Sequence, residues 1–259
     1  MPARRLSALL ALVVVAACGD AGHTREGTVT AVPASSLHVD DLVLVTVDTL
    51  RWDAVDFLGP HDDVTPTLDR LAAEGIVFPF AHAHNVVTLP SHTNILTGRL
   101  PYQHGVRDNS GFRLPASVPT LAETLRDAGF ATAAVVAAYP LDARFGLDRG
   151  FDLYDDYLAG DTGGGDRALE RSGQEVVTRA LAWWRENAGQ RRFLWVHLFE
   201  PHAPYEPPEP FASRFAGEPY LGEVATADAA LAPLLAEVTA PDASTLVAVT
   251  ADHGEALGD

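Results

Sequence analysis

Residues of the types that bind metal ions end two apolar runs of the chain. Asp48 lies at the end of DLVLVTVDT (41–49), and Asp252 and His253 lie at the end of STLVAVTADH (244–253). Two carboxylates and one imidazole suit Zn²⁺ or Mn²⁺, and Ca²⁺, which prefers oxygen ligands alone, is kept as an alternative. Carboxylates that are buried together repel each other unless a cation neutralises them. These residues therefore predict a site for one divalent metal ion.

The segment TLPSHTNILTG (88–98) predicts a short helix that begins at a residue able to act as a nucleophile. Pro90 is favoured in a first helical turn and Gly98 in a C-terminal cap. Thr88 would then lie among the unpaired backbone N–H groups of the helix N-terminus, which attract anions. As a fourth ligand to the metal, its hydroxyl could ionise near neutral pH and attack an ester. Helix capping is the purely structural alternative.

Strand and helix patterns alternate along the chain. Continuous runs rich in β-branched residues are typical of strands buried on both faces of a parallel sheet. Their alternation with helical patterns predicts an α/β fold, a doubly wound and mostly parallel sheet with helices on both faces. The predicted strands are 41–49, 131–138, 192–200 and 244–253, and the predicted helices are 65–75, 117–129, 166–189 and roughly 220–238.

Ionisable residues gather at the carboxyl ends of these strands. Glu200 and His202 follow the third strand, as Asp48 follows the first and the pair Asp252-His253 follows the fourth. Ligands of open α/β sheets bind at this edge, so we expect the three groups to form one site.

Composition restricts the class of partner. The chain has 259 residues, of which 47 % are hydrophobic and 20 % charged, which suits one large folded domain. Its formal charge is −17 and all 18 basic residues are arginine. Such acidity argues against binding of a nucleic-acid duplex, because phosphate neutralisation needs a basic face. An anionic ester substrate would need a local positive site, such as the metal or a helix N-terminus.

The N-terminus predicts export. MPARR is a charged beginning, LSALLALVVVAA is an apolar stretch too short to span a bilayer, and Val15-Ala16-Ala17-Cys18 resembles a bacterial lipobox. We expect residues 1–17 to be a lipoprotein signal peptide and 18–40 a flexible tether. Lipidated Cys18 would hold the protein on a membrane of the bacterial cell envelope, in the periplasm. A plain cleaved signal peptide with a chance cysteine is the alternative.

Four ordered segments carry a family resemblance: LVTVDTLRWDAV, TLPSHTNILTGRLPYQHGVRDN, FLWVHLFEPHAPY and TADHGEALGD. From about residue 41 onward the chain resembles the sulfatase-type branch of the alkaline phosphatase superfamily. The resemblance implies that Asp48, Asp252 and His253 bind a divalent metal and that Thr88 forms a covalent ester intermediate. It also implies that His202 contacts the sulfate or phosphate oxygens.

The chain departs from the sulfatase pattern at the nucleophile. Sulfatases have Cys or Ser, oxidised to formylglycine, in C/S-x-P-x-R, whereas this chain has Thr88 and, in place of the arginine, His92. It also has no lysine, whereas sulfatases use lysines on the sulfate. This version resembles the threonine-nucleophile phosphodiesterases and phosphoethanolamine transferases. In the phosphodiesterases the residue matching Asn109 donates to the developing oxyanion, worth ~3 kcal/mol.

Three further residues are expected to support the ligands from behind: His92, His197 and Glu200. Glu200 could instead complete a second metal site, but the phosphodiesterase Asp-x-x-x-His pattern is absent and one metal is favoured.

The sequence leaves three functions open. The first is an exported, metal-dependent hydrolase that cleaves sulfate esters or, as the threonine favours, phosphate esters. The second is a transferase that passes a phospho-group to a glycan or lipid. The third is a non-catalytic lipoprotein that binds an anion. Members of the family usually continue with further strands and a smaller subdomain, so we expect the catalytic domain at 41–259 to be C-terminally incomplete.

Overall fold

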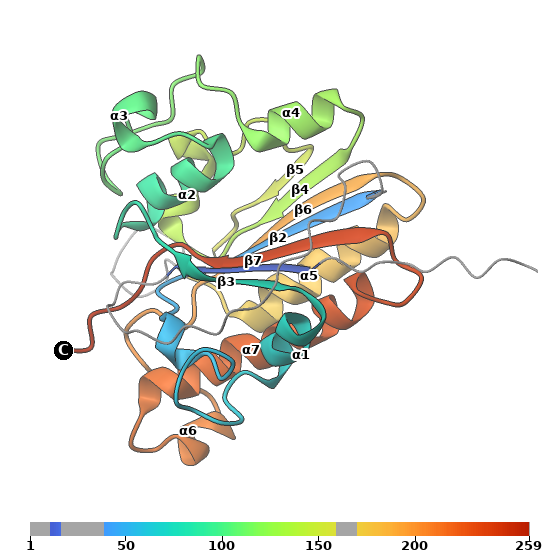
Figure 1. The fold of residues 1–259 in the computed structure, drawn as a ribbon. Coiled ribbons are helices and arrows are strands. Elements are labelled where there is room, and N and C mark those ends of the chain that lie inside the picture. The colour runs from blue at the N-terminus through green and yellow to red at the C-terminus, as the bar shows by residue number, and fades with distance from the viewer. Residues whose placement is uncertain (1–10, 17–38, 159–169, 259) are drawn as a thin grey trace, which may run out of the picture.

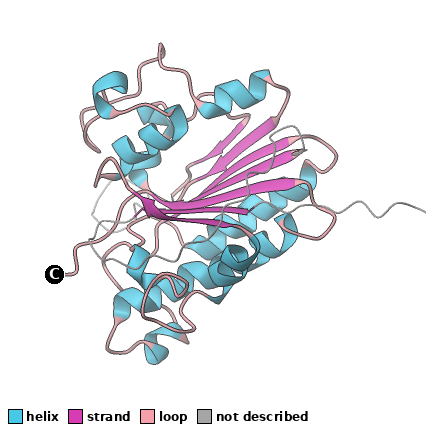
Figure 2. Ribbon diagram, in the orientation of Figure 1, coloured by secondary structure: helices cyan, strands magenta, loops and turns pink. Residues whose placement is uncertain are grey.

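A parallel sheet with helices on both faces forms the centre of the molecule. The computed structural model describes residues 11–16, 39–158 and 170–258. Within these ranges seven strands form one sheet in the order β3-β1-β7-β2-β6-β4-β5, and every pair of neighbours is parallel. Figures 1 and 2 show α1, α5 and α7 on one face of the sheet and α2, α3 and α4 on the other. The predicted fold class is confirmed.

The elements follow the chain in alternation. The strands are β1 (Ala11–Ala16), β2 (Asp41–Val47), β3 (Ile76–Ala81), β4 (Ala131–Val135), β5 (Leu153–Asp155), β6 (Arg192–Leu198) and β7 (Thr245–Ala251). The helices are α1 (Pro66–Glu74), α2 (Thr88–Thr97), α3 (Pro101–His104), α4 (Leu121–Asp127), α5 (Gly173–Glu186), α6 (Phe211–Arg214) and α7 (Pro219–Val238). Short 3-10 turns lie at Trp52–Ala54, Tyr139–Leu141 and Ala143–Phe145.

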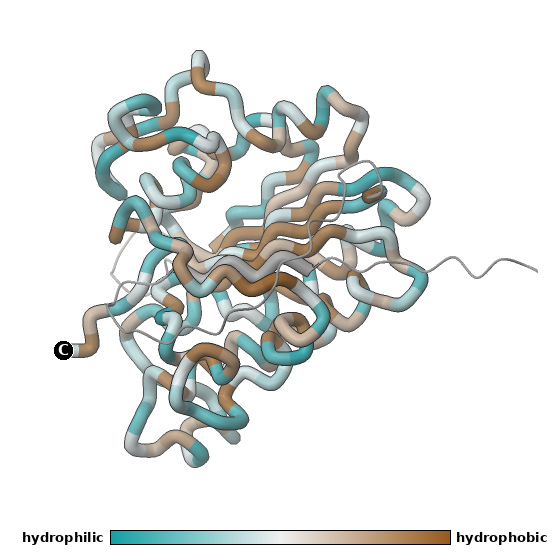
Figure 3. The backbone as a smooth tube through the Cα atoms, in the orientation of Figure 1, coloured by the Kyte–Doolittle hydropathy of each residue, from teal (hydrophilic) through white to brown (hydrophobic). Residues whose placement is uncertain are grey.

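The four apolar runs are strands β2, β4, β6 and β7, as predicted, and they lie side by side in the middle of the sheet. Burial on both faces explains why β2, β4 and β6 lack polar alternation, whereas alternate residues of β7 are only half-buried. Figure 3 shows hydrophobic residues along the strands. Side chains that alternate along the strands point to opposite faces of the sheet and pack into two hydrophobic cores. The core under α5 and α7 includes Val43, Val45, Val47, Leu231 and Leu234, and the core under α2 and α4 includes Leu44, Leu89, Leu96, Phe193 and Trp195.

The predicted helices are present, and three of them, α1, α4 and α5, begin later than the patterns indicate, whereas α7 begins at Pro219, close to the predicted start. Helix α5 starts at Gly173 instead of 166, because the Ser172 hydroxyl caps it by accepting from the Glu175 N–H at 3.3 Å. Helix α4 starts after Thr120, which forms a capping box with Glu123. The capping side chains therefore locate the start of these helices more accurately than the periodicity of hydrophobic residues does.

The short helix predicted at 88–98 is α2. It begins at Thr88 and ends before Gly98, whose φ of 63° is left-handed and whose N–H bonds to the Asn94 carbonyl at 2.8 Å. Its first turn lies at the edge of the sheet where the parallel strands end, which places Thr88 beside the predicted metal ligands.

Three strands escaped sequence analysis. Strands β3 and β5 are short or interrupted by proline, whereas β1 falls inside the apolar stretch expected to be a signal peptide. The structure inserts Ala11–Ala16 between β7 and β3, with Val13 opposite Val249 and Val77. The rest of the expected signal peptide, Cys18 and the tether up to residue 38 lie outside the described residues. Processing of the N-terminus stays a prediction.

No helix within the described ranges is both long and apolar enough to span a membrane.

Candidate metal centre

Strand pairing brings Asp48 and Asp252 together. Strands β2 and β7 are in parallel register with Val47 opposite Ala251, so the next residue of each strand is one of the two aspartates. The backbone ladder continues past both strand ends, since the Asp252 N–H bonds to the Val47 carbonyl at 3.4 Å and the Asp48 N–H bonds to the Leu198 carbonyl of β6 at 3.0 Å. Both side chains are buried, with exposed fractions of 0 % and 1 %. The meeting of two carboxylates is therefore a consequence of register.

Three buried polar atoms of this group have no hydrogen-bond partner: Asp48 Oδ1, Asp252 Oδ2 and His253 Nε2. The imidazole nitrogen lies 3.8 Å from the Asp48 oxygen and 3.5 Å from the Asp252 oxygen. Among the described residues, this is the group of acidic and histidine side chains whose ligand atoms converge, all within 4.8 Å of one another. Unsatisfied acceptors are costly in a protein interior, so the donor set fits a divalent cation.

The two carboxyls differ in acidity. Burial and the charge of Asp48 raise the pKa of Asp252 well above its usual value. Burial also opposes ionisation of Asp48, but His197 and His253 outweigh it and lower the pKa of that carboxyl. In the absence of a cation one carboxylate thus stays ionised while its neighbour takes up a proton. A bound cation would offset the charge of Asp48, and the carboxyl of Asp252 could then ionise as well.

The first turn of α2 places Thr88 against the carboxylates. The Thr88 hydroxyl donates to Asp48 Oδ2 at 3.4 Å, and the Ser91 hydroxyl donates to the Asp252 carbonyl at 2.6 Å. Asn109 also lies here, since its Oδ1 accepts the Leu89 N–H at 2.8 Å. With Oδ1 occupied, Asn109 has its amide nitrogen as the remaining donor beside the threonine. The structure thus brings together the predicted nucleophile, its metal ligands and the predicted oxyanion donor.

His92 ties this turn to the sheet. Its Nδ1 donates to the Thr88 carbonyl at 2.8 Å, because a carbonyl only accepts, and its Nε2 lies 3.0 Å from Thr46 Oγ1. That hydroxyl accepts from Trp195 Nε1 at 3.0 Å and so has its own proton for His92. Burial lowers the pKa of His92 to about 3. A neutral imidazole therefore holds the carbonyl of Thr88, the predicted nucleophile.

Sequence analysis missed Thr46 and Trp195, although one signal was present. Thr46 lies two residues before Asp48 on the same strand, and residues two apart on a strand share a face. A buried hydroxyl and a buried indole N–H both need a hydrogen-bond partner, so a bond between Thr46 and Trp195 could have been predicted.

His202 lies at the border of the site. It stacks on Phe199 with ring centroids 4.4 Å apart, and its Nδ1 donates to the Ala203 carbonyl at 2.7 Å. It is near enough for its charge to lower the pKa of Asp48. No described hydrogen bond joins it to the carboxylates, so Nε2 is the atom left to meet a substrate.

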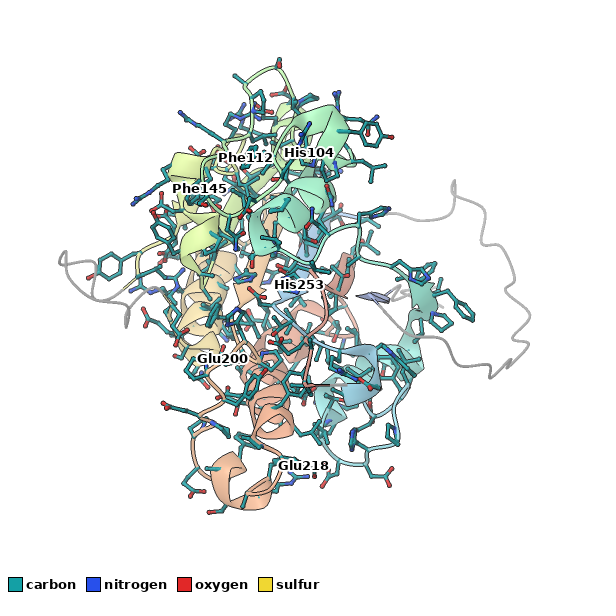
Figure 4. All side chains as sticks on the ribbon, turned by 90° about the vertical axis from the view of Figure 1, so that its left-hand side faces the viewer. His104, Phe112, Phe145, Glu200, Glu218 and His253 are labelled. Carbon is teal, nitrogen blue, oxygen red and sulfur yellow. The ribbon has the colours of Figure 1, made fainter. Side chains whose placement is uncertain are left out.

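Glu200 is not among the groups that contact the carboxylates. Its two oxygens accept the Gly173 N–H at 2.9 and 3.1 Å, at the start of α5. It lines a cavity of about 730 Å³ together with Glu170, Glu206 and Glu223, and His202 lines the same cavity. Figure 4, which looks onto this edge of the sheet, shows Glu200 and His253 apart. The expectation that Glu200 supports the ligands is therefore wrong: it lies past the strand end, where the chain turns toward α5.

The turn that follows Asp48 is strained at Thr49. Thr49 has a φ of 53°, a left-handed conformation that is unfavourable for a β-branched residue. Its N–H donates to Asp252 Oδ1 at 3.2 Å, and its carbonyl accepts the Tyr220 hydroxyl at 2.8 Å. The same hydroxyl accepts the Arg51 N–H at 2.9 Å. Tyr220 of α7 thus holds the turn through two backbone groups, which we call the Tyr220 clamp. Nothing in the sequence predicts this role.

The fold and this edge cluster define a class, the alkaline phosphatase and sulfatase type of α/β protein. A family model described as Sulfatase matches residues 40–259, and the chain belongs to the sulfatase family. The N-acetylgalactosamine-6-sulfatase of Sus scrofa is 33 % identical over 127 residues, 43 % of this chain and 24 % of that protein. Arylsulfatase G of Mus musculus is 33 % identical over 121 residues, 44 % of this chain and 23 % of that protein. The matched part thus covers about a quarter of these relatives.

Solved structures share the fold. The phosphonate monoester hydrolase of Agrobacterium radiobacter is similar with a TM-score of 0.67 and 19 % identity, over 85 % of this chain and 63 % of that one. A protein of the alkaline phosphatase superfamily from Vibrio parahaemolyticus is similar with a TM-score of 0.65 and 20 % identity, over 88 % and 58 %.

Loss of the Tyr220 hydroxyl should weaken both the fold and the metal site. In Tyr220→Phe the Arg51 N–H and the Thr49 carbonyl lose their shared partner, so the free energy of unfolding should fall by about 1–3 kcal/mol. Because the freed turn carries Asp48, Zn²⁺ affinity should fall roughly 10-fold. Urea unfolding and calorimetric titration measure the two effects.

Tyr154→Phe is the matched control, since the Tyr154 hydroxyl also donates to a backbone carbonyl, that of Leu141, at 2.6 Å in a partly buried position. It should lose stability and keep its Zn²⁺ affinity. An equal loss of affinity in both variants would contradict the clamp.

The acidic cavity predicts a pH-dependent stability. Burial, then the charges of Glu200 and Glu170, raise the pKa of Glu223 from 4.5 to about 7. The unfolded chain therefore releases this proton first as pH rises, and stability falls between these two values and stays low above them. In Glu223→Gln the amide still accepts the Glu206 N–H, so the melting temperature should rise by roughly 3 °C at about pH 8 and change little below pH 4.5.

Glu186→Gln, which removes an equal charge from an exposed position, is the control and should show no such pH-dependent gain. Differential scanning calorimetry at both pH values measures the melting temperatures. An increase that is the same at low and high pH would rule out the titration of Glu223 as its cause.

Proposed function

We propose that this protein is a metal-dependent ester hydrolase that acts through a covalent intermediate on Thr88. The observation that carries the proposal is the placement of the Thr88 hydroxyl, at the start of α2 and 3.4 Å from Asp48, beside three buried ligand atoms without partners. A capping threonine does not need two carboxylates and an imidazole next to it. Membership of the sulfatase family supports the same chemistry.

Each residue has a role in this reaction. Asp48, Asp252 and His253 would hold the divalent ion, which when bound acidifies the nucleophile and offsets negative charge on the ester. The Thr88 oxygen attacks the sulfur or phosphorus atom with the helix N-terminus behind it. Asn109 donates its amide N–H to the oxygen that gains charge. His202, protonated at Nε2, protonates the leaving group, and water then releases the bound group from Thr88.

Phosphate esters are the substrates that the site supports best, with sulfate esters as the alternative. Threonine has no route to formylglycine, the aldehyde of the sulfatase mechanism, and the chain has no lysine to bind sulfate. A threonine oxygen can form a phosphate ester directly. The fold likeness extends to a phosphonate monoester hydrolase as well as to a 2-O sulfatase.

Substitution of the nucleophile tests the proposal. Thr88→Ala should abolish turnover of an aryl phosphodiester, a phosphate monoester and an aryl sulfate, with kcat down about 10³-fold or more, while stability changes little. Asp252→Asn should abolish turnover and also the binding of about one equivalent of Zn²⁺ or Mn²⁺. Chromogenic assays and metal analysis of the purified chain give the readouts.

Thr97→Ala is the control, because Thr97 lies on the same helix and its hydroxyl bonds to neither carboxylate: it donates to the Thr93 carbonyl at 2.6 Å and accepts the Arg99 N–H at 3.3 Å. It should retain turnover. Turnover that survives in Thr88→Ala would contradict the assignment of Thr88 as the nucleophile. A folded wild type that binds no divalent metal would contradict the metal centre.

We also propose that the protein is exported and anchored by a lipid on Cys18, supported by the lipobox-like run that ends there. Expressed in a bacterium, the protein should enter the membrane fraction with a mass that shows loss of residues 1–17 and addition of a diacylglycerol. Cys18→Ser should leave that fraction.

Removal of residues 1–17 would also remove β1, so the same experiment bears on the sheet. Recovery of a mature chain that still contains residues 11–16 would contradict the signal peptide and favour their place between β7 and β3.

A further inference from the structure

One buried histidine of the site has an atom that no role assigned above uses. His197 lies on β6 with an exposed fraction of 0 %, and its Nε2 has no hydrogen-bond partner. It lies opposite Thr46 in the β2–β6 register, and Asp48, two residues further on, shares that face of the sheet. The unpartnered Nε2 lies 3.6 Å from Asp48 Oδ2.

The other ring nitrogen determines the tautomer of His197. Nδ1 accepts the backbone N–H of Ala137 at 3.3 Å, and a backbone N–H can only donate. Nδ1 therefore carries the lone pair, and the single proton of the neutral ring is on Nε2. The ring is also packed edge-on against His92, with centroids 4.9 Å apart, in a fully buried environment. The proton on Nε2 thus points at the Asp48 carboxylate.

This tautomer argues that His197 is not a metal ligand. Ligation through Nε2 would need the lone pair there and would move the proton to Nδ1, against the Ala137 N–H. Two donors would then face each other in a buried space. His253 differs, because its Nδ1 lies 2.8 Å from the Gly254 carbonyl and so carries the proton, which leaves Nε2 as a donor of electrons to a metal.

We propose that His197 is a positioning residue, which donates its Nε2–H to Asp48 Oδ2 and so directs Oδ1 of that carboxylate toward the metal ion. The inference rests on the proposed function, since it assigns how one of its ligands is oriented. Asp48 Oδ2 then faces two donors, His197 and the Thr88 hydroxyl, while Oδ1 faces His253. Nε2 and Oδ2 lie 3.6 Å apart, and a cation that kept Asp48 ionised would strengthen the attraction between the Nε2–H and the carboxylate.

Two substitutions separate the two ring nitrogens. In His197→Gln the amide nitrogen can occupy the place of Nε2 and donate to Asp48, but the acceptor for Ala137 is lost. In His197→Asn the side-chain oxygen can occupy the place of Nδ1 and accept from Ala137, but the donor to Asp48 is lost. The proposal expects the glutamine variant to bind Zn²⁺ much as the wild type does and the asparagine variant to bind about 10-fold more weakly or worse.

Competition titration with a chelating dye measures the affinities, and urea unfolding of the metal-free chains reports folding separately. An asparagine variant that binds as tightly as wild type, or a glutamine variant that binds more weakly than it, would overturn the proposal. Nitrogen-15 NMR of the metal-free protein supplies an independent test: His197 should be protonated on Nε2, and protonation on Nδ1 would also overturn it. Failure of the wild type to bind Zn²⁺ would instead overturn the metal centre, and the positioning role with it.

Discussion

The repulsion between Asp48 and Asp252 is the interaction on which the rest of the site depends. Parallel register between β2 and β7 forces the two carboxylates together, and burial prevents water from screening them. The surrounding groups respond to this one constraint. Backbone N–H groups of Thr49 and His253 bond to Asp252 Oδ1, the Thr88 hydroxyl bonds to Asp48 Oδ2, and the other oxygen of each carboxylate has no hydrogen-bond partner. A site that leaves these atoms unsatisfied is organised for a cation.

Rigid support surrounds the carboxylates on three sides. From the sheet, Trp195 and Thr46 fix His92, which holds the carbonyl of Thr88. From α7, the Tyr220 hydroxyl holds the strained turn at Thr49. The start of α2 supplies Ser91, whose hydroxyl bonds to the Asp252 carbonyl. Strain at a functional turn persists only where neighbouring contacts over-determine it, and these contacts do so.

The environment of the site is unevenly charged. The cavity past β6 concentrates Glu170, Glu200, Glu206 and Glu223, while the site itself contains the neutral histidine His92 and the donors at the start of α2. His202 lies between the two regions, since its charge contributes to the lowered pKa of Asp48 and partly offsets the burial that raises the pKa of Glu170. An anionic ester would thus be attracted to the metal side and repelled from the acidic cavity. The charge distribution favours one orientation of an anionic substrate.

The sequence by itself determined the fold class, the central strands and the group of Asp48, Thr88, Asp252 and His253. Long apolar runs admit few arrangements other than buried parallel strands, and their ends must then meet at one edge. Only the tertiary structure decided which neighbours support that group. His197 and Glu200 are three residues apart, yet one faces Asp48 and the other α5, because side-chain direction after a strand end depends on the turn. It also decided the place of Ala11–Ala16, because an apolar signal segment and a buried strand share the same composition, and only the partners of the backbone distinguish them.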